Sequence, residues 1–213
     1  MLRPPMIALY YYHPASSMAS HIALEESGLA FEPRLARRDN PEERARLLHD
    51  NPKGSVPTLV VDGETLTENV AILDYIAGAA PGARLCPRSP WARAQCLSML
   101  AWFASTVHVN FRRAMRPQRI SADIGAHAAI VAAGRIEFEE NLNVIDGLLQ
   151  DRSWLMGRQF TVADGYVMVF IHWARLGGFR LDPFANILRF QDRMLARPAV
   201  HRVLVREGSA LVA

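Results

Sequence analysis

The chain has 213 residues, of which 50% are hydrophobic and 21% charged, and its formal net charge is +3. This length predicts one or two domains, and this composition excludes a chain that is mostly disordered. Cys86 and Cys96 are too few for a disulfide scaffold and match neither CxxC spacing nor a zinc-ligand set, so we expect free thiols in a reducing compartment. No stretch approaches the roughly 20 apolar residues of a membrane helix, and we expect a cytoplasmic protein that does not act at a membrane.

The basic residues are almost all arginine, with 23 Arg and a single lysine, Lys53. They are spread along the chain apart from two small groups, Arg34/Arg37/Arg38 and Arg112/Arg113/Arg116/Arg119. A nucleic-acid-binding protein concentrates its basic residues on one face. We therefore expect no nucleic-acid partner, and the modest positive charge favours small anionic ligands.

The first part of the chain alternates short strands and short helices. The order β-α-β-α-β-β-α predicts a parallel first pair of strands with a right-handed crossover. An Asp-Gly pair at 62–63 predicts a hairpin between the last two strands. The expected strands are Met6–Tyr12, Phe31–Ala36, Thr58–Val61 and Glu64–Thr67, and the expected helices run from Ser16 or Ser17 to Gly28, from Asn40 onward, and over Glu68–Ala79.

The second part of the chain is predicted to be entirely helical. Residues 81–90 are rich in proline and read as a linker, which predicts domains at 1–80 and 91–213. The segment Tyr166–Leu176 is apolar on all sides, so we expect it at the centre of its domain. The expected helices are Pro90–Arg113, Ala122–Gln150, Tyr166–Leu176, Phe184–Ala196 and Pro198–Glu207.

Ser16 and Ser17 open the first helix, directly after the first strand. Backbone N–H groups and the helix dipole favour an anion at such a place, and a thiolate held there is stabilised. The alternative is that both serines only cap the helix. No GxSxG motif surrounds them, so serine hydrolysis gains no support.

The loop from Lys53 to Pro57 is a second candidate site. If the Val56–Pro57 bond is cis, the Val56 backbone is free to pair with a peptide-like ligand as an added strand would. The alternative is an ordinary trans loop. Glu68 and Asn69 begin the next helix and could receive an α-amino and α-carboxylate head group, or could simply cap the helix.

His108 lies inside a predicted helix, near Ser105, and a lone histidine in a helix is more often structural than functional. The seven histidines show neither HExxH nor another paired spacing, so we expect no metal site. No phosphate-binding glycine motif occurs, so nucleotide binding has no support either.

Four segments together resemble the cytosolic glutathione transferase family, and most closely its bacterial beta class. They are Tyr11–Gly28 (YYHPASSMASHIALEESG), Asn51–Pro57 (NPKGSVP), Leu66–Tyr75 (LTENVAILDY) and Phe160–Tyr166 (FTVADGY). The resemblance covers nearly the whole chain. It implies an α/β thioredoxin-like N-terminal domain that binds glutathione, followed by an all-α helical-bundle C-terminal domain that lines the pocket for the second substrate, and it implies a homodimer.

The resemblance also implies roles for individual residues. Val56, with a cis Pro57, would pair with the cysteinyl part of glutathione. Glu68 and Asn69 would hold its γ-glutamyl end, Lys53 matches a basic residue of the family loop, and His108 would lie near the sulfur within the segment Ser105–His108.

The chain departs from the beta class in one respect. That class carries a cysteine just ahead of the first helix, where this chain has Ser16 or Ser17. A mixed disulfide with glutathione is therefore excluded there, and a serine hydroxyl that donates to the thiolate is the expected replacement. Tyr11 and Tyr12 are weaker candidates for the same role.

The function expected from these observations is transfer of the glutathione thiolate to small hydrophobic electrophiles. The alternatives are a glutathione-dependent isomerase or dehalogenase, and a non-catalytic protein of the same fold that binds a ligand or a protein. The electrophile itself is not predicted, because its pocket is built from variable helical residues such as Phe103, Arg112 and Met115.

Overall fold

The computed structural model describes residues 5–212, so the outermost residues of the predicted domains, 1–4 and 213, lie outside it. Within the described part, the N-terminal domain follows the expected element order. Its elements are β1 (Ile7–Tyr11), α1 (Ser17–Ser27), β2 (Glu32–Leu35), α2 (Pro41–Asp50), β3 (Thr58–Val61), β4 (Glu64–Thr67) and α3 (Asn69–Ala79).

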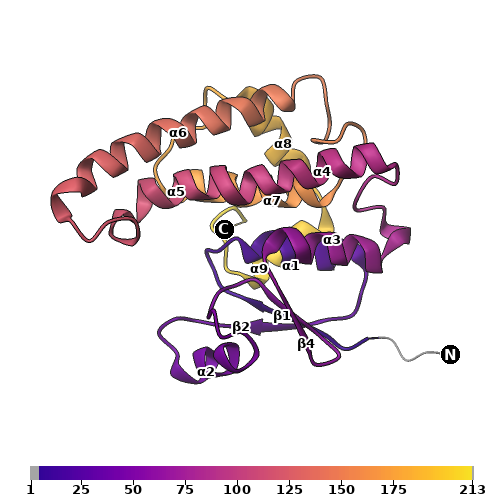
Figure 1. The fold of residues 1–213 in the computed structure, drawn as a ribbon. Helices are drawn as coiled ribbons and strands as arrows, with labels where there is room; N and C mark the ends of the chain where they lie inside the picture. The colour runs from indigo at the N-terminus through magenta and orange to yellow at the C-terminus, as the bar shows by residue number, and fades with distance from the viewer. Residues whose placement is uncertain (1–4, 213) are drawn as a thin grey trace.

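The described strands form one mixed sheet in the order β2-β1-β3-β4. β1 and β2 are parallel, whereas β3 is antiparallel to both β1 and β4. Helices α1 and α3 lie side by side over one face of this sheet and α2 lies on the other side (Figure 1). The N-terminal domain therefore has the predicted thioredoxin-like architecture.

Local sequence signals explain where the elements of this domain begin and end. Gly28 ends α1 in the left-handed region at φ 72°. The Asn40 side chain accepts hydrogen bonds from the backbone N–H groups of Glu42 and Glu43 at the start of α2, with Pro41 as the first helical residue. The signals at the helix ends thus define the boundaries more closely than the apolar pattern alone.

Apart from an isolated β-bridge between Trp154 and Gly157, the regular elements described in the C-terminal domain are all helices. Its main helices are α4 (Pro90–Trp102), α5 (His108–Met115), α6 (His127–Leu148), α7 (Val162–Leu176), α8 (Ala185–Leu195) and α9 (Pro198–Arg206). A π-helical segment, Phe103–Val107, joins α4 to α5, so the single helix expected over Pro90–Arg113 is continuous but changes its winding. Short 3-10 turns occupy Pro81–Ala83, Pro117–Arg119 and Ile124–Ala126.

The sequence placed the start of α6 too early, at Ala122. The Asp123 side chain accepts a hydrogen bond from the Gly125 backbone N–H at 2.9 Å and begins the turn Ile124–Ala126 instead. An aspartate that bonds its own backbone two residues on stabilises a turn in competition with a helix.

Helix α7 occupies the centre of the molecule, as its composition predicted. All of its residues from Val162 to Ala174 are buried. Asp164 in its first turn accepts hydrogen bonds from the backbone N–H groups of Thr161 (2.7 Å) and Leu155 (2.8 Å). Because α7 contacts α1 and α3 as well as α4 and α8, it joins the two domains through one apolar core.

Arg197 and Glu207, the residues on either side of α9, attach the C-terminal end of the chain to α1. The Glu207 carboxylate contacts His21 Nδ1 at 2.8 Å, and both side chains are fully buried. Arg197 pairs with Glu26 through two hydrogen bonds of 2.6 and 2.7 Å. These contacts fix α1, whose N-terminal end faces the cleft between the domains.

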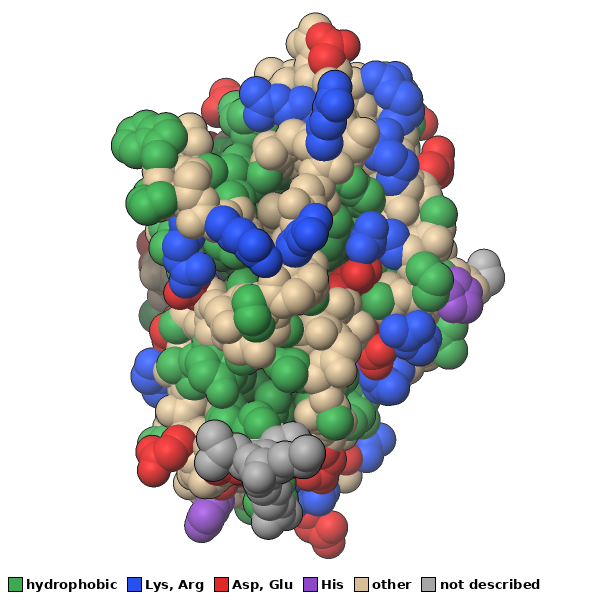
Figure 2. Space-filling view, turned by 90° about the vertical axis from the view of Figure 1, so that its right-hand side faces the viewer, with side chains coloured by type: hydrophobic (Ala, Val, Ile, Leu, Met, Phe, Trp, Pro, Cys, Tyr) green, Lys and Arg blue, Asp and Glu red, His purple; other side chains and the backbone are tan. Residues whose placement is uncertain are grey.

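Two further features of the described residues bear on the sequence predictions. Cys86 and Cys96 are both free thiols. None of the described helices combines the length and the apolar character that crossing a membrane requires. Figure 2 shows the face on the right of Figure 1, with Lys and Arg side chains mostly in the upper half and a broad hydrophobic area in the lower half.

Candidate active site

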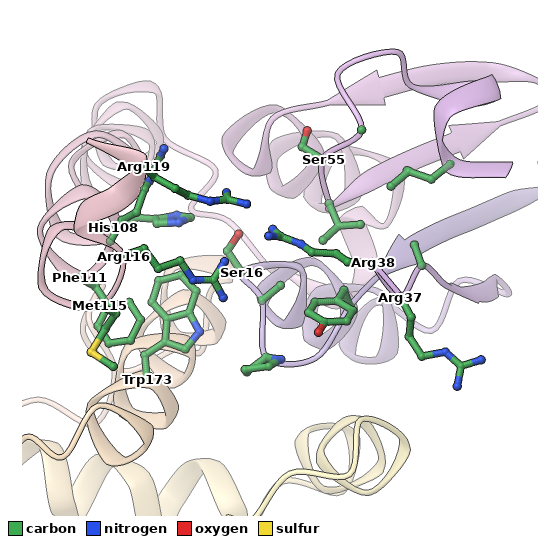
Figure 3. Close-up of a pocket in the computed structure, with 18 of the residues that line it drawn as sticks. Ser16, Arg37, Arg38, Ser55, His108, Phe111, Met115, Arg116, Arg119 and Trp173 are labelled. Carbon is green, nitrogen blue, oxygen red and sulfur yellow. The ribbon is translucent and has the colours of Figure 1, made fainter. Parts of the chain in front are cut away.

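A cavity of about 670 Å³ opens between the two domains (Figure 3). Its N-terminal side consists of the β1–α1 loop, the segment that leads from β2 into α2, and the loop before β3. Its other side consists of α5, the turn Pro117–Arg119 and the C-terminal end of α7. This volume lies in the range of small-molecule sites.

Ser16 lies at the N-terminal end of α1 and lines this cavity. The residue is 6% exposed, and its hydroxyl makes no hydrogen bond with any residue that the structure describes. Figure 3 shows the hydroxyl pointing into the space between the domains. The N–H groups at the start of α1 favour an anion at the same place. The Ser16 hydroxyl is therefore free to donate a hydrogen bond to an anionic atom in the cavity.

Ser17, the other candidate, is bonded within the β1–α1 loop. Its Oγ accepts a hydrogen bond from the Tyr12 backbone N–H at 3.2 Å and donates one to the Tyr12 carbonyl at 3.3 Å. Ser17 is fully buried and does not line the cavity. Of the two serines, Ser16 is the one whose hydroxyl faces the cavity.

The loop before β3 presents its backbone to the cavity at Val56. The Val56–Pro57 peptide bond is cis, as expected, and so is the His13–Pro14 bond. Val56 lines the cavity, and its backbone N–H makes no hydrogen bond within residues 5–212. Val56 is therefore free to pair with the backbone of a peptide-like ligand.

Asn51 holds this loop in place, a role that the sequence analysis missed. Its Nδ2 donates hydrogen bonds to the Thr58 Oγ1 at 2.8 Å and to the Ser55 carbonyl at 3.0 Å. Asn51 is 2% exposed. Its place directly after α2, in a loop rich in proline and glycine, was the available signal, since Asn commonly bonds nearby backbone groups.

Glu68 and Asn69 lie beside the cavity rather than in its lining. Glu68 adopts φ 71°, which is uncommon for a residue other than glycine, and its carboxylate accepts a hydrogen bond from Lys53 Nζ at 3.0 Å. Asn69 is buried, and its Nδ2 donates to the Ser16 carbonyl at 2.8 Å while its Oδ1 accepts from the Ser20 hydroxyl at 2.6 Å. The Asn69 side chain thus connects the start of α3 to the start of α1 and holds the Ser16 backbone.

His108 lines the cavity from the first turn of α5. Its ring packs edge-on against Trp173, with 4.8 Å between the ring centroids. Burial, together with the positive charges of Arg112 and Arg116, lowers the pKa of His108 to about 4. The imidazole is therefore neutral near pH 7, and it offers one N–H donor rather than a positive charge.

Ser105 and Tyr11 also lie outside the lining of the cavity, as do Ser17, Pro57, Glu68 and Asn69. Ser105 is exposed on the segment Phe103–Val107, and its hydroxyl donates to the Ala101 carbonyl at 2.8 Å. Tyr11 is buried, with its ring 4.9 Å from that of His21, and it lines a smaller cavity of about 280 Å³ beside Glu207. Ser16, Lys53, Val56 and His108 are the predicted site residues that the fold brings together.

The feature that the sequence analysis missed most completely is a group of arginines around the cavity. The two small groups of basic residues, which seemed unrelated in sequence, meet here from opposite sides. Arg38 extends from the N-terminal side toward Arg116 and Arg119 on the other side, whereas Arg37 points away (Figure 3). The arginines in the lining are Arg37, Arg38, Arg44, Arg112, Arg116 and Arg119.

These charges are close enough to affect one another. The pKa of Arg38 is lowered by partial burial and, after that, by the positive charges of Arg119, Arg116 and Arg44. No Asp or Glu belongs to the described lining of the cavity. Nor do residues 5–212 contain a His, Cys, Asp and Glu cluster that could hold a metal ion. The cavity therefore offers hydrogen-bond donors and positive charge to an anionic ligand.

Comparison with known proteins gives two family models. The glutathione S-transferase N-terminal domain matches residues 6–78, and the glutathione S-transferase C-terminal domain matches residues 108–198. Together they account for most of the chain.

Several known proteins are similar to this chain along nearly its full length. Glutathione S-transferase GstA of Escherichia coli O157:H7 is 34% identical, with 94% of this chain and 98% of that protein covered. The maleylacetoacetate isomerase of Pseudomonas aeruginosa is 29% identical, with 89% and 91% covered. The structure of the beta-class glutathione S-transferase of Sphingomonas chungbukensis has a TM-score of 0.84 at 33% identity. That of a sphingomonad glutathione S-transferase complexed with glutathione has a TM-score of 0.84 at 32% identity. Each comparison covers 94% of this chain and 98% of the other chain. The chain belongs to the glutathione S-transferase family of enzymes and is similar to its bacterial beta-class members.

Proposed function

We propose that this protein uses glutathione as cosubstrate and transfers its thiolate to small electrophiles with an apolar body. The observation that carries the proposal is the Ser16 hydroxyl, which lies unbonded at a helix N-terminus in a cavity that Val56 of the same domain also lines. The glutathione bound to the sphingomonad relative supports the choice of cosubstrate.

In this proposal the Val56 backbone pairs with the cysteinyl residue of glutathione and brings the sulfur to the start of α1. Lys53 and the N-terminal end of α3, at Glu68 and Asn69, receive the carboxylate and amino groups of the tripeptide. Ser16 donates a hydrogen bond to the sulfur, with Ser17 as the second candidate, and the neutral His108 borders the space for the electrophile.

The chemistry needs a thiolate at neutral pH and two reactants held together. The thiol proton goes to solvent, the sulfur lone pair forms a bond to the electrophilic carbon, and the leaving group departs with its electron pair. A free thiol has a pKa of about 8.5, so any group that stabilises the thiolate raises the reactive fraction at pH 7. Binding both reactants in one cavity removes the cost of their encounter.

A glutathione-dependent isomerase is the second candidate. It shares the glutathione site and differs in what the α5 side of the cavity accepts. The likeness to a maleylacetoacetate isomerase favours this candidate over a dehalogenase. A non-catalytic binding protein of the same fold remains an outcome of the test.

The test is retention on immobilised glutathione, followed by conjugation of 1-chloro-2,4-dinitrobenzene. We expect retention, elution by free glutathione, and turnover that falls in Ser16→Ala. Ser105→Ala is expected to keep its turnover, because that hydroxyl lies outside the cavity. Retention without turnover of this or other electrophiles would favour a binding protein, and the absence of retention would contradict the proposal.

We also propose a homodimer in the cytoplasm, with domains at 1–80 and 91–213 joined by 81–90. The matched regions of the two family models are consistent with this division. Trp91 at the start of α4 is 76% exposed, which is unusual for so large an apolar side chain and supports a partner surface there. Light scattering at micromolar concentration should give twice the mass of one chain, and a single-chain mass would contradict the dimer.

A further inference from the structure

The arginines around the cavity are mostly without carboxylate partners. Arg37 pairs with Glu43, but the other guanidinium groups in the lining form no ion pair with any residue in 5–212. These are Arg38, Arg44, Arg112, Arg116 and Arg119. Elsewhere in the described structure many arginines have carboxylate partners, as Arg113 does with Glu137 and Arg197 with Glu26.

Bound glutathione does not account for all of this charge. As a thiolate it carries two carboxylates, one ammonium and one sulfur anion, a net charge of −2. Five unpaired guanidinium groups around a ligand of charge −2 leave three positive charges, while Lys53 is already bonded to Glu68. The glutathione site alone therefore does not explain the arginines on both sides.

The excess lies on the side of the electrophile. Val56 and Arg44 belong to the N-terminal side, where the tripeptide is proposed to bind, whereas Arg112, Arg116 and Arg119 belong to α5 and the turn after it. Figure 3 shows Arg116 and Arg119 extending to the space in front of Ser16. Apolar side chains complete the same wall, namely Phe111, Met115, Trp173 and Leu176.

We propose that the electrophile is an anion: an apolar or aromatic body that packs against Phe111 and Trp173 and carries a carboxylate held by Arg116 and Arg119. Guanidinium groups bind carboxylates through charge-assisted, often bidentate hydrogen bonds. Burial and, after it, the positive charges of Arg119, Arg116 and Arg44 lower the pKa of Arg38, and an anion that enters the cavity relieves the repulsion among these charges. This inference rests on the proposed glutathione function and names the substrate class for it.

The test compares two stable thioethers, S-(4-carboxybenzyl)glutathione and S-(4-carbamoylbenzyl)glutathione, which have nearly the same shape and differ in charge. Calorimetry measures the Kd of each for the wild-type protein and for the double variant Arg116→Gln/Arg119→Gln. Arg88→Gln is the control, because Arg88 is exposed and lines neither of the described cavities. Neither target side chain has a partner in the described structure, so the fold is expected to tolerate both changes.

We expect the carboxylate to bind at least about tenfold more tightly than the carboxamide, equivalent to about 1.4 kcal/mol. The double variant should bring this ratio close to one with little change for the carboxamide, Arg88→Gln should keep the ratio, and added salt should reduce it. Equal affinities in the wild type, or a ratio that persists in the double variant, would overturn the anionic subsite while the glutathione function stands. If neither thioether binds, the proposed function fails and the inference fails with it.

Discussion

Replacing Ser16 by alanine should raise the pKa of bound glutathione. The Ser16 hydroxyl has no partner in the described structure, so its hydrogen bond is available to the sulfur. A hydrogen bond to a charged group contributes about 1.5–3 kcal/mol, and one pKa unit corresponds to about 1.4 kcal/mol. The expected increase is therefore about 1–2 units, while the start of α1 and the arginines keep part of the stabilisation.

At pH values below the thiol pKa, Ser16→Ala should slow the reaction by a smaller factor than the factor by which the thiolate fraction falls. A more basic thiolate is a stronger nucleophile, by roughly threefold per pKa unit, which offsets part of the roughly tenfold loss of ionised fraction. The net effect is a decrease of about 3- to 12-fold in kcat/KM for the electrophile at low pH. At high pH, where the thiol is ionised in both proteins, the more basic thiolate of the variant should react faster by about threefold per pKa unit. Ultraviolet difference titration of the thiolate measures the pKa directly, and the pH profile of kcat/KM measures its consequence.

Ser17→Ala is the matched control for this experiment. Its hydroxyl bonds the Tyr12 backbone, so its loss should lower the free energy of unfolding by about 1–3 kcal/mol without changing the thiol pKa. An unchanged thiol pKa in Ser16→Ala would refute the reasoning. A shift in Ser17→Ala alone would transfer the role to Ser17.

Three further changes test other parts of the account. Asn51→Ala removes two hydrogen bonds that hold the Val56 loop, so it should lower the free energy of unfolding by about 1–3 kcal/mol in denaturant titrations and raise the KM for glutathione. An unchanged KM would show that this loop does not take part in glutathione binding. Gly134→Ala should lower the free energy of unfolding by about 1–3 kcal/mol in denaturant titrations and reduce turnover, because the new Cβ would lie 2.5 Å from the Ala114 backbone nitrogen on α5. Unchanged stability and turnover would show that α5 can shift without affecting the site. The pKa of His108 is about 4 in the folded protein, below the value near 6.5 of an unfolded histidine, so the unfolded state binds more protons between pH 4 and pH 6.5. The stability that the neutral ring contributes is therefore present above about pH 6.5 and is lost as the pH falls toward 4. His108→Asn should flatten this part of the pH–stability curve, and an NMR titration that places the pKa of His108 near 6.5 would contradict this prediction.

The fold was predictable from the sequence because its signals are local. Gly28, Asn40 with Pro41, and the Asp-Gly pair at 62–63 each specify a boundary through backbone chemistry, and the structure has those boundaries. The predicted start of α6 was wrong because the Asp123 side chain accepts a hydrogen bond from the Gly125 backbone N–H and so stabilises a turn in place of a helix. The spacing of apolar residues does not reveal this competition.

The site was only partly predictable because its residues meet across the two domains. The choice between Ser16 and Ser17 depends on where each hydroxyl bonds, and adjacent serines look alike in sequence. Arg38 and Arg119 are far apart in the chain. They lie around one cavity because α7 and α9 pack against α1, which places α5 and the turn after it opposite the N-terminal loops, and no local pattern reports this arrangement. The role of Asn69 in holding the Ser16 backbone is equally a matter of tertiary contact.

A crystal structure of the protein with glutathione tests the central claim most directly. The account predicts the sulfur within about 3.5 Å of the Ser16 Oγ, the cysteinyl backbone paired with the Val56 N–H, and a path from the sulfur to the space between Arg116 and Arg119 that remains open. A complex in which the sulfur lies away from Ser16, or in which glutathione occupies another part of the molecule, would contradict it.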